Sequence, residues 1–366
     1  MNKMIVANLV HRPIRSVISI VAVAVEVTLI LLIVGLALGI LDDNKVRQKG
    51  TGADILVRPP GSANFSAFSS APVSVKIGDI IRKQPHVAAV APVVMQTTNN
   101  IEILNGIDIQ TFEELGGPMR YLEGGPFRGP YDMIVDDYLA ASSKVHVGTK
   151  VESLNHEFRI CGVVPHGRGA RRYVPIKTLQ ELIGMENKAS IFYVKLDDPH
   201  NDILVAQEIK SIPGMENYNV MTISEWLAIM SADNIPGLSI FIRVVIGIAM
   251  VIGFIVIFQS MYTAVMERTR EIGILKSLGA SKSYVVRVIL RETLLLAVAG
   301  ILVGFIFSMA GRAGIVHSFP TLRILPITWK WALYATLIAI GGAMLGAIYP
   351  AFKAAQKDPI DALAYE

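Results

Sequence analysis

Cysteine is almost absent from this sequence, which holds one, Cys161, among 366 residues. A single cysteine excludes a disulfide within the chain, and no group of cysteines and histidines has the spacing of metal ligands. The sequence also lacks a G-x-x-x-x-G-K-[ST] phosphate loop and any recognisable Ser/His/Asp, Cys/His or paired-carboxylate motif. These absences leave an enzyme or a metal site without support.

Charged residues are scarce as well, at 17% against about 25% in soluble domains, while 52% of the residues are hydrophobic. The excess lies in long apolar runs that can cross a hydrocarbon core of about 30 Å as helices. The first run is too long for the core of a signal peptide, about 7 to 15 residues, so we expect it to be retained. The predicted spans are residues 17–41, 238–263, 292–316 and 329–349.

Lysine and arginine set the expected orientation of these spans. They crowd the lead-in 1–16, the connection 264–291 and the tail 350–366, whereas the connection between the third and fourth spans holds only Arg312 and Arg323. By the positive-inside rule the three basic segments are cytoplasmic. We therefore expect a multi-pass protein of the cytoplasmic (inner) membrane with both termini in the cytoplasm, and we interpret the net charge of +4 as an orientation signal rather than a nucleic-acid footprint.

The segment 42–237 is then extracytoplasmic, as is the short outer loop 317–328. Segment 42–237 alternates short strand patterns with helical ones, which predicts an α+β domain with more than one lobe, inserted between the first two spans. A hairpin is expected around Asn155-His156, and Cys161 is expected as a buried strand thiol. The predicted strands are 53–58, 87–97, 100–107, 150–154, 157–164, 190–196 and 218–222, and the predicted helices are 74–84, 176–183 and 202–211.

The connection between the second and third spans carries the most informative pattern. Ile272, Leu275 and Leu278 recur at three-residue spacing and predict one apolar stripe on a short helix. Gly279 suits the C-cap of this helix, and Ser281 suits the N-cap of the helix that becomes the third span. Two interpretations fit such a helix: it lies on the lipid surface, or it docks onto another protein and transmits force.

The helical pattern does not decide between these interpretations, but a resemblance carried by the exact residues favours docking. The string Glu267-Arg-Thr-Arg-Glu-Ile-Gly-Ile-Leu-Lys-Ser-Leu-Gly-Ala280 closely resembles the signature of the FtsX/MacB-type ABC transporter permease superfamily. The tail Tyr349-Pro-Ala-Phe-Lys-Ala-Ala-Gln-Lys-Asp-Pro-Ile-Asp-Ala-Leu363 is similar to the closing pattern of that family, and Ala7-Asn-Leu-Val-His-Arg-Pro-Ile-Arg-Ser16 resembles its basic lead-in. The inserted segment is similar only loosely, in Cys161-Gly-Val-Val-Pro and Tyr173-Val-Pro-Ile-Lys-Thr-Leu.

The resemblance implies a MacB-like permease whose connection 264–291 contacts a separate ABC ATP-binding subunit. It assigns the coupling role to Glu267, Arg268, Arg270, Glu271, Gly273 and Leu278. It also implies a second permease copy, in a homodimer or a heterodimer, with a periplasmic adaptor or an outer-membrane partner as a further candidate. The ATPase that MacB carries at its N-terminus has no counterpart in the short lead-in, so ATP and Mg are expected on the partner and no cofactor on this chain.

Glu26 lies inside the first predicted span, where a carboxylate costs about 2.5–3.5 kcal/mol. It must face a partner, a water-filled cavity or the bundle interior, or be protonated. A contact with a substrate or an ion and a packing hydrogen bond between helices both remain open.

Two other groups of residues have alternative interpretations. Glycines spaced as G-x-x-x-G permit close helix approach, either within the chain or between two copies. The basic loop 166–172 predicts a solvated hairpin tip, or else a contact of Arg168, Arg171 and Arg172 with an acidic partner or lipid headgroups. The glycine motifs are Gly35-x-x-x-Gly39, Gly300-x-x-x-Gly304 and Gly342-x-x-x-Gly346.

The resemblance leaves three functions open. In the first, ATP hydrolysis by the separate subunit moves the inserted domain to export or extract a substrate. In the second, the chain regulates cell-wall hydrolases as FtsX does. In the third, it extracts lipoproteins or lipids as the Lol-type permeases do.

Overall fold

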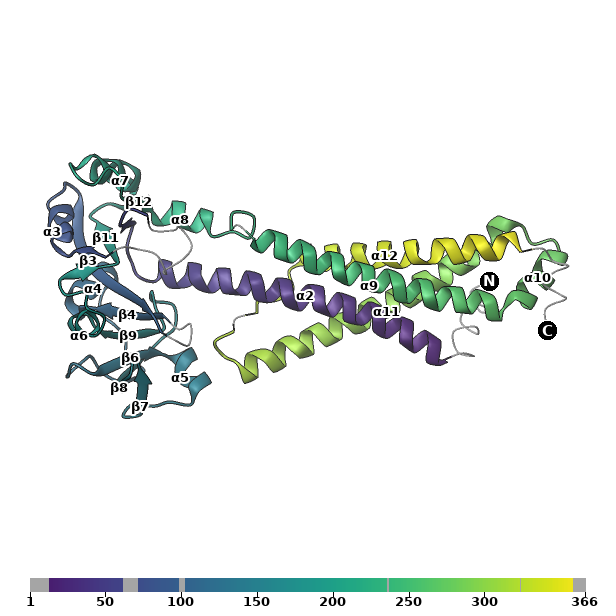
Figure 1. The fold of residues 1–366 in the computed structure, drawn as a ribbon, viewed down its shortest axis with the longest axis horizontal. Coiled ribbons are helices and arrows are strands. Elements are labelled where there is room, and N and C mark those ends of the chain that lie inside the picture. The colour runs from purple at the N-terminus through teal and green to yellow at the C-terminus, as the bar shows by residue number, and fades with distance from the viewer. Residues whose placement is uncertain (1–12, 62–71, 99–102, 236, 323, 358–366) are drawn as a thin grey trace. The chain divides into compact units, whose positions relative to one another are not determined.

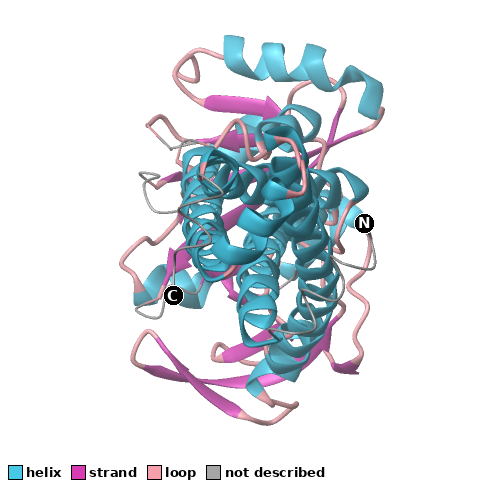
Figure 2. Ribbon diagram, turned by 90° about the vertical axis from the view of Figure 1, so that its right-hand side faces the viewer, coloured by secondary structure: helices cyan, strands magenta, loops and turns pink. Residues whose placement is uncertain are grey.

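The structure, a computed structural model, describes residues 13–61, 72–98, 103–235, 237–322 and 324–357. Within these residues four helices are long and apolar enough to cross a membrane (Figure 1). A unit of strands (Figure 2) and short helices lies between the first two of them in the order of elements, which confirms the predicted fold class. The four helices are α2 (Pro13–Lys49), α9 (Leu238–Glu267), α11 (Lys282–Ser318) and α12 (Trp329–Gln356).

The chain divides into two compact units. The membrane unit contains the chain up to Gly39, Pro236–His317 and the chain from Ile324 onward. The inserted unit contains Ile40–Ile235 together with Ser318–Arg323. The helix α2 therefore begins in the membrane unit, and its last turns belong to the inserted unit.

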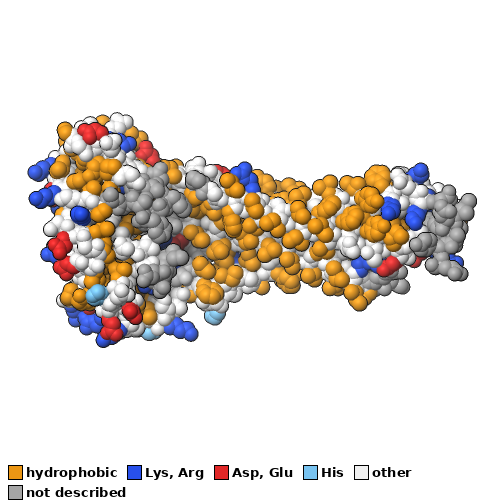
Figure 3. Space-filling view, viewed as in Figure 1, with side chains coloured by type: hydrophobic (Ala, Val, Ile, Leu, Met, Phe, Trp, Pro, Cys, Tyr) orange, Lys and Arg blue, Asp and Glu red, His pale blue; other side chains and the backbone are white. Residues whose placement is uncertain are grey.

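Apolar side chains cover the visible face of the long helices (Figure 3). On α9, five exposed apolar residues recur at helical spacing and form a stripe. Each is about half exposed: Ile240, Val244, Ile248, Val251 and Ile255. A stripe of this kind is stable only against lipid or another apolar surface.

Glycines set the closest helix contacts of the membrane unit. A Cβ added at Gly300 or Gly304 of α11 would lie 2.6 Å or 2.8 Å from a valine Cβ of α2. A Cβ added at Gly346 of α12 would lie 2.8 Å from the carbonyl oxygen of Phe254 in α9. The second and third glycine motifs thus pack helices against one another within the chain.

The inserted unit is built on one mixed sheet of ten strands, ordered β12-β1-β11-β3-β4-β9-β6-β8-β5, with β7 paired to β8. Most neighbours are antiparallel, but β4 runs parallel to β9 and β6 runs parallel to β8. The strands are β1 (Ile55–Arg58), β3 (Val87–Thr97), β4 (Ile103–Ile107), β5 (Glu123–Gly124), β6 (Asp132–Asp136), β7 (Lys150–Ser153), β8 (His156–Val164), β9 (Arg172–Pro175), β11 (Ile191–Leu196) and β12 (Asn219–Thr222). The short β2 (Val73–Ser74) and β10 (Lys188–Ala189) form a separate pair.

Two hydrophobic clusters lie on this sheet. One packs Phe192 and Ile55 under α3 and α7, and the other packs Phe158 and Leu104 with Leu179 of α6. The helices of this unit are α3 (Lys76–Arg82), α4 (Ile109–Gly116), α5 (Asp137–Ser143), α6 (Ile176–Leu182), α7 (Asp202–Ser211) and α8 (Ile223–Ile229).

The structure places an element in each predicted strand and helix, although residues 100–102 of one predicted strand lie outside the described residues. The predicted hairpin is β7–β8, but its two turn residues are Leu154 and Asn155, which both have positive φ. Short elements with weak patterns, such as β6, α4 and α5, were not predicted. Cys161 is partly buried in β8, and burial raises the pKa of its thiol to about 12.

Candidate functional site

The connection between α9 and α11 forms a sharp corner around the short helix α10 (Thr269–Ser277). Gly279 ends α10 with φ of 94°, because the amides of Gly279 and Ala280 donate to the carbonyls of Lys276 and Leu275, both at 3.0 Å. This Schellman arrangement needs the left-handed conformation that glycine adopts without strain. Ser281 Oγ then accepts from the amide of Tyr284 at 3.3 Å and caps α11. The Ser281 cap agrees with the sequence prediction, whereas Gly279 lies one residue beyond the C-cap, which is Leu278.

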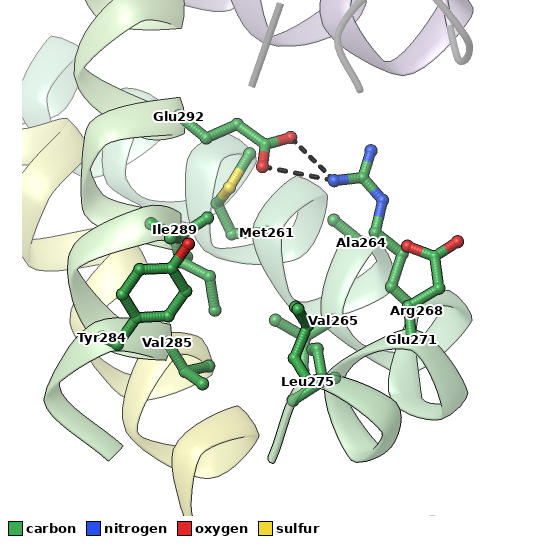
Figure 4. A pocket seen from close by; sticks show the side chains of 12 residues that line it. Met261, Ala264, Val265, Arg268, Glu271, Leu275, Tyr284, Val285, Ile289 and Glu292 are labelled. Carbon is green, nitrogen blue, oxygen red and sulfur yellow. Dashed lines mark hydrogen bonds and ion pairs between the residues drawn. The ribbon is translucent and has the colours of Figure 1, made fainter. Parts of the chain in front are cut away.

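An ion pair ties this corner to α11. Nη1 of Arg268 lies 3.2 Å from each carboxylate oxygen of Glu292, and the two side chains are only 12% and 9% exposed (Figure 4). Beside the pair is a small cavity of about 60 Å³, lined mainly by apolar side chains such as Val265, Leu275 and Val285. Arg268 therefore holds α10 against α11 instead of facing outward.

The outward face of α10 consists of other residues. Arg270 is exposed, Ile274 is 44% exposed, and Leu278, at the C-cap, is 80% exposed. The prediction of one apolar stripe is therefore wrong for Leu278. Ile272 and Leu275 line the cavity against α11, whereas Leu278 lies beyond the last helical residue and points away from it.

The remaining predicted coupling residues lie on either side of α10. Gly273 is buried, and Glu271 is exposed at the rim of the cavity. Glu267, the last residue of α9, forms an ion pair with Arg15 near the start of α2. The corner therefore contacts α2 as well as α11.

Lys276 belongs to this site although no sequence pattern singles it out. Its Nζ donates to the carbonyl oxygen of Ala355 at 3.0 Å and to that of Lys357. A lysine at the C-terminus of a helix satisfies carbonyls that have no partner within the helix. Through this contact α10 is attached to the end of α12, a pairing of residues too distant in sequence for local patterns to reveal.

Removing one partner of the Arg268–Glu292 pair should destabilise the corner strongly. We expect Arg268→Gln to lower the free energy of unfolding by about 3–5 kcal/mol, because it leaves a buried carboxylate uncompensated. Adding Glu292→Gln should recover much of that loss, and Arg270→Gln, at an exposed position, should change little. The measurement is denaturant unfolding of the full chain in detergent. A double variant no more stable than Arg268→Gln alone would contradict the pairing.

Glu26 lies within the membrane unit and is 2% exposed. Neither of its carboxylate oxygens has a hydrogen-bond partner among the described residues. Its carboxyl group lies against bare glycine backbone: a Cβ at Gly253 of α9 would come within 2.0 Å of Oε2, and one at Gly342 of α12 within 3.9 Å of Oε1. Glu26 thus faces the bundle interior, one of the expected environments.

The basic loop 166–172 is not a solvated tip. Arg168 donates to the carbonyls of Gly117 and Pro118, and Arg172 is only 8% exposed. Arg171 Nη2 lies 3.1 Å from Asp43 Oδ2, near the end of α2, and 2.8 Å from the carbonyl oxygen of Thr321. The loop is ordered because its guanidinium groups satisfy acceptors that are distant in sequence. Contact with an acidic partner stays a prediction.

His166 is the centre of a charged cluster that the sequence did not identify. It is buried between two carboxylates, with Nδ1 2.7 Å from Asp136 Oδ2 and Nε2 2.9 Å from Asp43 Oδ1. Tyr138 stacks on its ring at a centroid distance of 4.3 Å. Burial lowers the pKa of His166, but the hydrogen bond to Asp136 and the nearby carboxylate of Asp43 outweigh burial and raise the pKa above 6.5.

This raised pKa predicts a loss of stability at alkaline pH. The stabilisation from charged His166 is fully present below pH 6.5, the ordinary value, and is lost as pH rises through the higher pKa of the folded protein. We expect the thermal midpoint of the full chain in detergent to fall over that range. The fall should be smaller in His166→Gln, while His156→Gln, at an exposed position, should behave like the native chain. Equal slopes in all three proteins would refute the assignment.

Two family profiles cover most of the chain. Residues 16–212 match the MacB-like periplasmic core domain, and residues 243–359 match the FtsX-like permease C-terminal domain. The first match alone spans more than half of the 366 residues. The second includes α10 and the corner around it.

Curated relatives agree with these matches. An uncharacterized ABC transporter permease of Bacillus subtilis, YknZ, is 38% identical over 122 residues, which are 33% of this chain and 30% of that protein. The macrolide export ATP-binding/permease protein MacB of Neisseria gonorrhoeae is 24% identical over 98% of this chain and 60% of its own length. The chain thus spans no more than about 60% of either relative.

Among solved structures, the periplasmic region of MacB from Actinobacillus actinomycetemcomitans aligns with 51% of this chain and 95% of its own length, at 18% identity and a TM-score of 0.38. The extracellular domain of YknZ aligns with 46% of this chain and 99% of its own, at 19% identity and a TM-score of 0.36. The family assignment rests on the sequence matches. By these matches, the chain belongs to the FtsX/MacB-type family of ABC transporter permeases.

Proposed function

We propose that this permease docks an ATP-binding subunit on the exposed face of α10 and transmits its movement to the inserted unit for export or extraction of a substrate. The observation that carries the proposal is the two-sided character of α10. One side packs on α11 around the cavity, while the opposite side leaves Arg270, Ile274 and Leu278 exposed. An exposed leucine and isoleucine beside an arginine are typical of a surface that is buried in a protein interface rather than left in water.

The contacts of α10 supply the route by which force would leave the docking surface. Arg268 links it to α11, Lys276 links it to the end of α12, and the ion pair between Glu267 and Arg15 links the preceding residue to α2. A push on α10 would therefore displace these helices together. In contrast, a helix lying passively on lipid has no need for such ties.

The helix α2 supplies the onward path. It is continuous from Pro13 to Lys49 and carries Asp43 and Arg47 into the inserted unit. There Asp43 is held by His166 and Arg171. Rotation or translation of α2 would be imposed directly on β6 and on the loop that these side chains anchor.

The remaining parts of the proposal follow from the family. The 366 residues contain no phosphate loop, so ATP and Mg would bind to a partner ATPase. The permease would work with a second copy of itself or with a related permease, in the inner membrane with α10 in the cytoplasm. The exposed stripe on α9 is a candidate for that contact.

The test is affinity purification of the tagged full chain from its native membrane. We expect an ABC ATP-binding subunit to co-purify with the native chain and to be lost from the variant Ile274→Asp/Leu278→Asp. The matched control is Ile203→Asp/Leu204→Asp, which places the same two charges on an exposed isoleucine and leucine of α7. Equal recovery of the ATPase with both variants would refute docking at α10. A cell-wall hydrolase or a lipoprotein recovered with the chain would replace export with FtsX-like or Lol-type function.

A further inference from the structure

The inserted unit contains a cavity of about 390 Å³ that the proposed function does not use. Its size falls in the range of small-ligand sites, about 300–1,000 Å³. Segments far apart in the sequence meet there: the last turns of α2, β4, the end of α5, the basic loop 166–172 and the connection before α12. The polar residues of its wall are Asn44, Arg47, Gln48, Asn105, Ser142, Ser143, Arg171, Arg172 and Thr321.

The described wall of the cavity is rich in arginine. Arg47, Arg171 and Arg172 line it, and the described lining residues include no aspartate or glutamate. Asp43 contacts two of these arginines, Arg47 at 3.0 Å and Arg171 at 3.1 Å, while its other oxygen faces His166. Two arginines and a protonated His166 thus share two carboxylates, Asp43 and Asp136, which leaves one positive charge in excess within this cluster.

Two of these arginines also have N–H donors that form no hydrogen bond within the described residues. Each guanidinium carries five N–H donors. Arg47 Nε lies 3.0 Å from Asp43 Oδ2 in an ion pair without a hydrogen bond, and Arg47 Nη2 donates to Asn44 Oδ1. Arg171 Nη2 donates to Asp43 Oδ2 and to the carbonyl oxygen of Thr321. Within the described residues, Nη1 of Arg47 and Nη1 of Arg171 make no hydrogen bond. Both side chains are held in place, at 17% and 20% exposure, so these donors are fixed before a ligand arrives.

Asn105 is a second, independent observation that points to a polar ligand. Its side chain lines the cavity and the residue is 4% exposed, yet its Oδ1 has no hydrogen-bond partner among the described residues. Leaving a buried polar atom unpaired costs about 1–3 kcal/mol. An amide can turn either its oxygen or its N–H donors toward a ligand.

The position of the cavity along α2 limits the chemical class of its ligand. Asn44, Arg47 and Gln48 follow the expected end of the first span at Leu41 by about 5 to 10 Å at 1.5 Å per residue. The headgroup region beyond the hydrocarbon core is about 5 to 7 Å thick on each side. The wall of the cavity on α2 thus begins where lipid phosphates lie.

We propose that this cavity is a binding site for a phosphate group, held by Arg47 and Arg171 with the hydroxyls of Ser142 and Ser143. Guanidinium groups pair with phosphate oxygens through two parallel hydrogen bonds, and serine hydroxyls donate to the remaining oxygens. The phosphate comes either from an anionic phospholipid headgroup or from a soluble phosphate compound.

The test uses the full chain with two probes. Inorganic phosphate is titrated into the detergent-purified protein and followed by calorimetry. Separately, nanodiscs of phosphatidylcholine with or without phosphatidylglycerol are prepared, and the retained lipid is counted by native mass spectrometry. Saturable binding of either probe, weakened by salt, supports the site. Phosphate binding identifies a soluble source, and selective retention of phosphatidylglycerol identifies a headgroup.

Variants locate the binding in this cavity. Arg47→Gln/Arg171→Gln should weaken the binding of whichever probe binds to the native chain by about 100-fold. Each charged hydrogen bond lost accounts for roughly tenfold. Arg47→Lys/Arg171→Lys keeps the positive charges but not the two parallel hydrogen bonds of a guanidinium group, so this variant should weaken probe binding by less. The control, Arg120→Gln, removes an exposed arginine of the same unit outside the cavity and should bind as the native chain does. Circular dichroism confirms that each variant is folded. Failure of both probes to bind, or equal binding by folded Arg47→Gln/Arg171→Gln, would overturn the proposal.

Discussion

Replacing Gly346 with leucine should prevent α9 and α12 from packing, so that little monodisperse protein is recovered in detergent. A Cβ at this position would lie 2.8 Å from the carbonyl oxygen of Phe254 and 3.1 Å from the amide nitrogen of Phe258. Both atoms belong to the backbone of α9, which cannot rotate away as a side chain can. The helices must therefore separate, and the whole apolar contact between them is lost.

The same helix offers a matched control. A Cβ at Gly341 would meet nothing within 4 Å among the described residues. Gly341→Leu adds the same apolar volume and the same helix propensity, and we expect it to be recovered in native yield. The measurement is size-exclusion chromatography with thermal unfolding. Similar profiles for the two variants would show that the close approach of α9 and α12 is not needed for folding.

The expected difference is large because lipid does not drive helices together as water does. In a membrane, association depends on close packing and on hydrogen bonds between helices. Besides the glycines, the membrane unit has a buried hydrogen bond between Ser19 and Ser260, with the two oxygens 2.6 Å apart. Substituting a glycine at a contact therefore removes much of what holds two helices together.

The sequence predicted best those features that depend on neighbouring residues. The four long helices follow from uninterrupted apolar runs, and the caps at Gly279 and Ser281 follow from the conformations these residues prefer. The β7–β8 hairpin was predicted for the same reason, although the turn begins one residue earlier, at Leu154.

The sequence failed where distant residues decide the structure. A basic stretch such as 166–172 is normally solvated, and only the fold brings Asp43, Gly117 and Thr321 to its arginines. Lys276 likewise acquires its role from the end of α12. A helical pattern assigns Leu278 to the apolar stripe, but the pattern cannot show that α10 ends before that residue.

A proline at Gly273 should leave the four long helices intact and abolish coupling to the ATPase. Gly273 lies in the interior of α10 and is buried. Proline there removes a helical hydrogen bond and clashes with the preceding turn, at a cost of about 3 kcal/mol or more, which a helix of nine residues cannot absorb. The outward positions of Ile274 and Leu278 would be lost together with the Arg268 and Lys276 contacts.

Lys282→Pro is the matched control for this prediction. Lys282 is the first residue of α11 after the Ser281 cap, a position where proline is well tolerated because its amide has no helical partner. Both variants should reach the membrane in native amounts. In nanodiscs to which the ATPase co-purified with the native chain is added, Lys282→Pro should keep ATP hydrolysis and the ATP-dependent change in hydrogen exchange of the inserted unit, whereas Gly273→Pro should lose both. If Gly273→Pro retained the exchange response, force would have to enter the permease somewhere other than α10, and the exposed face of that helix would lose its assigned role.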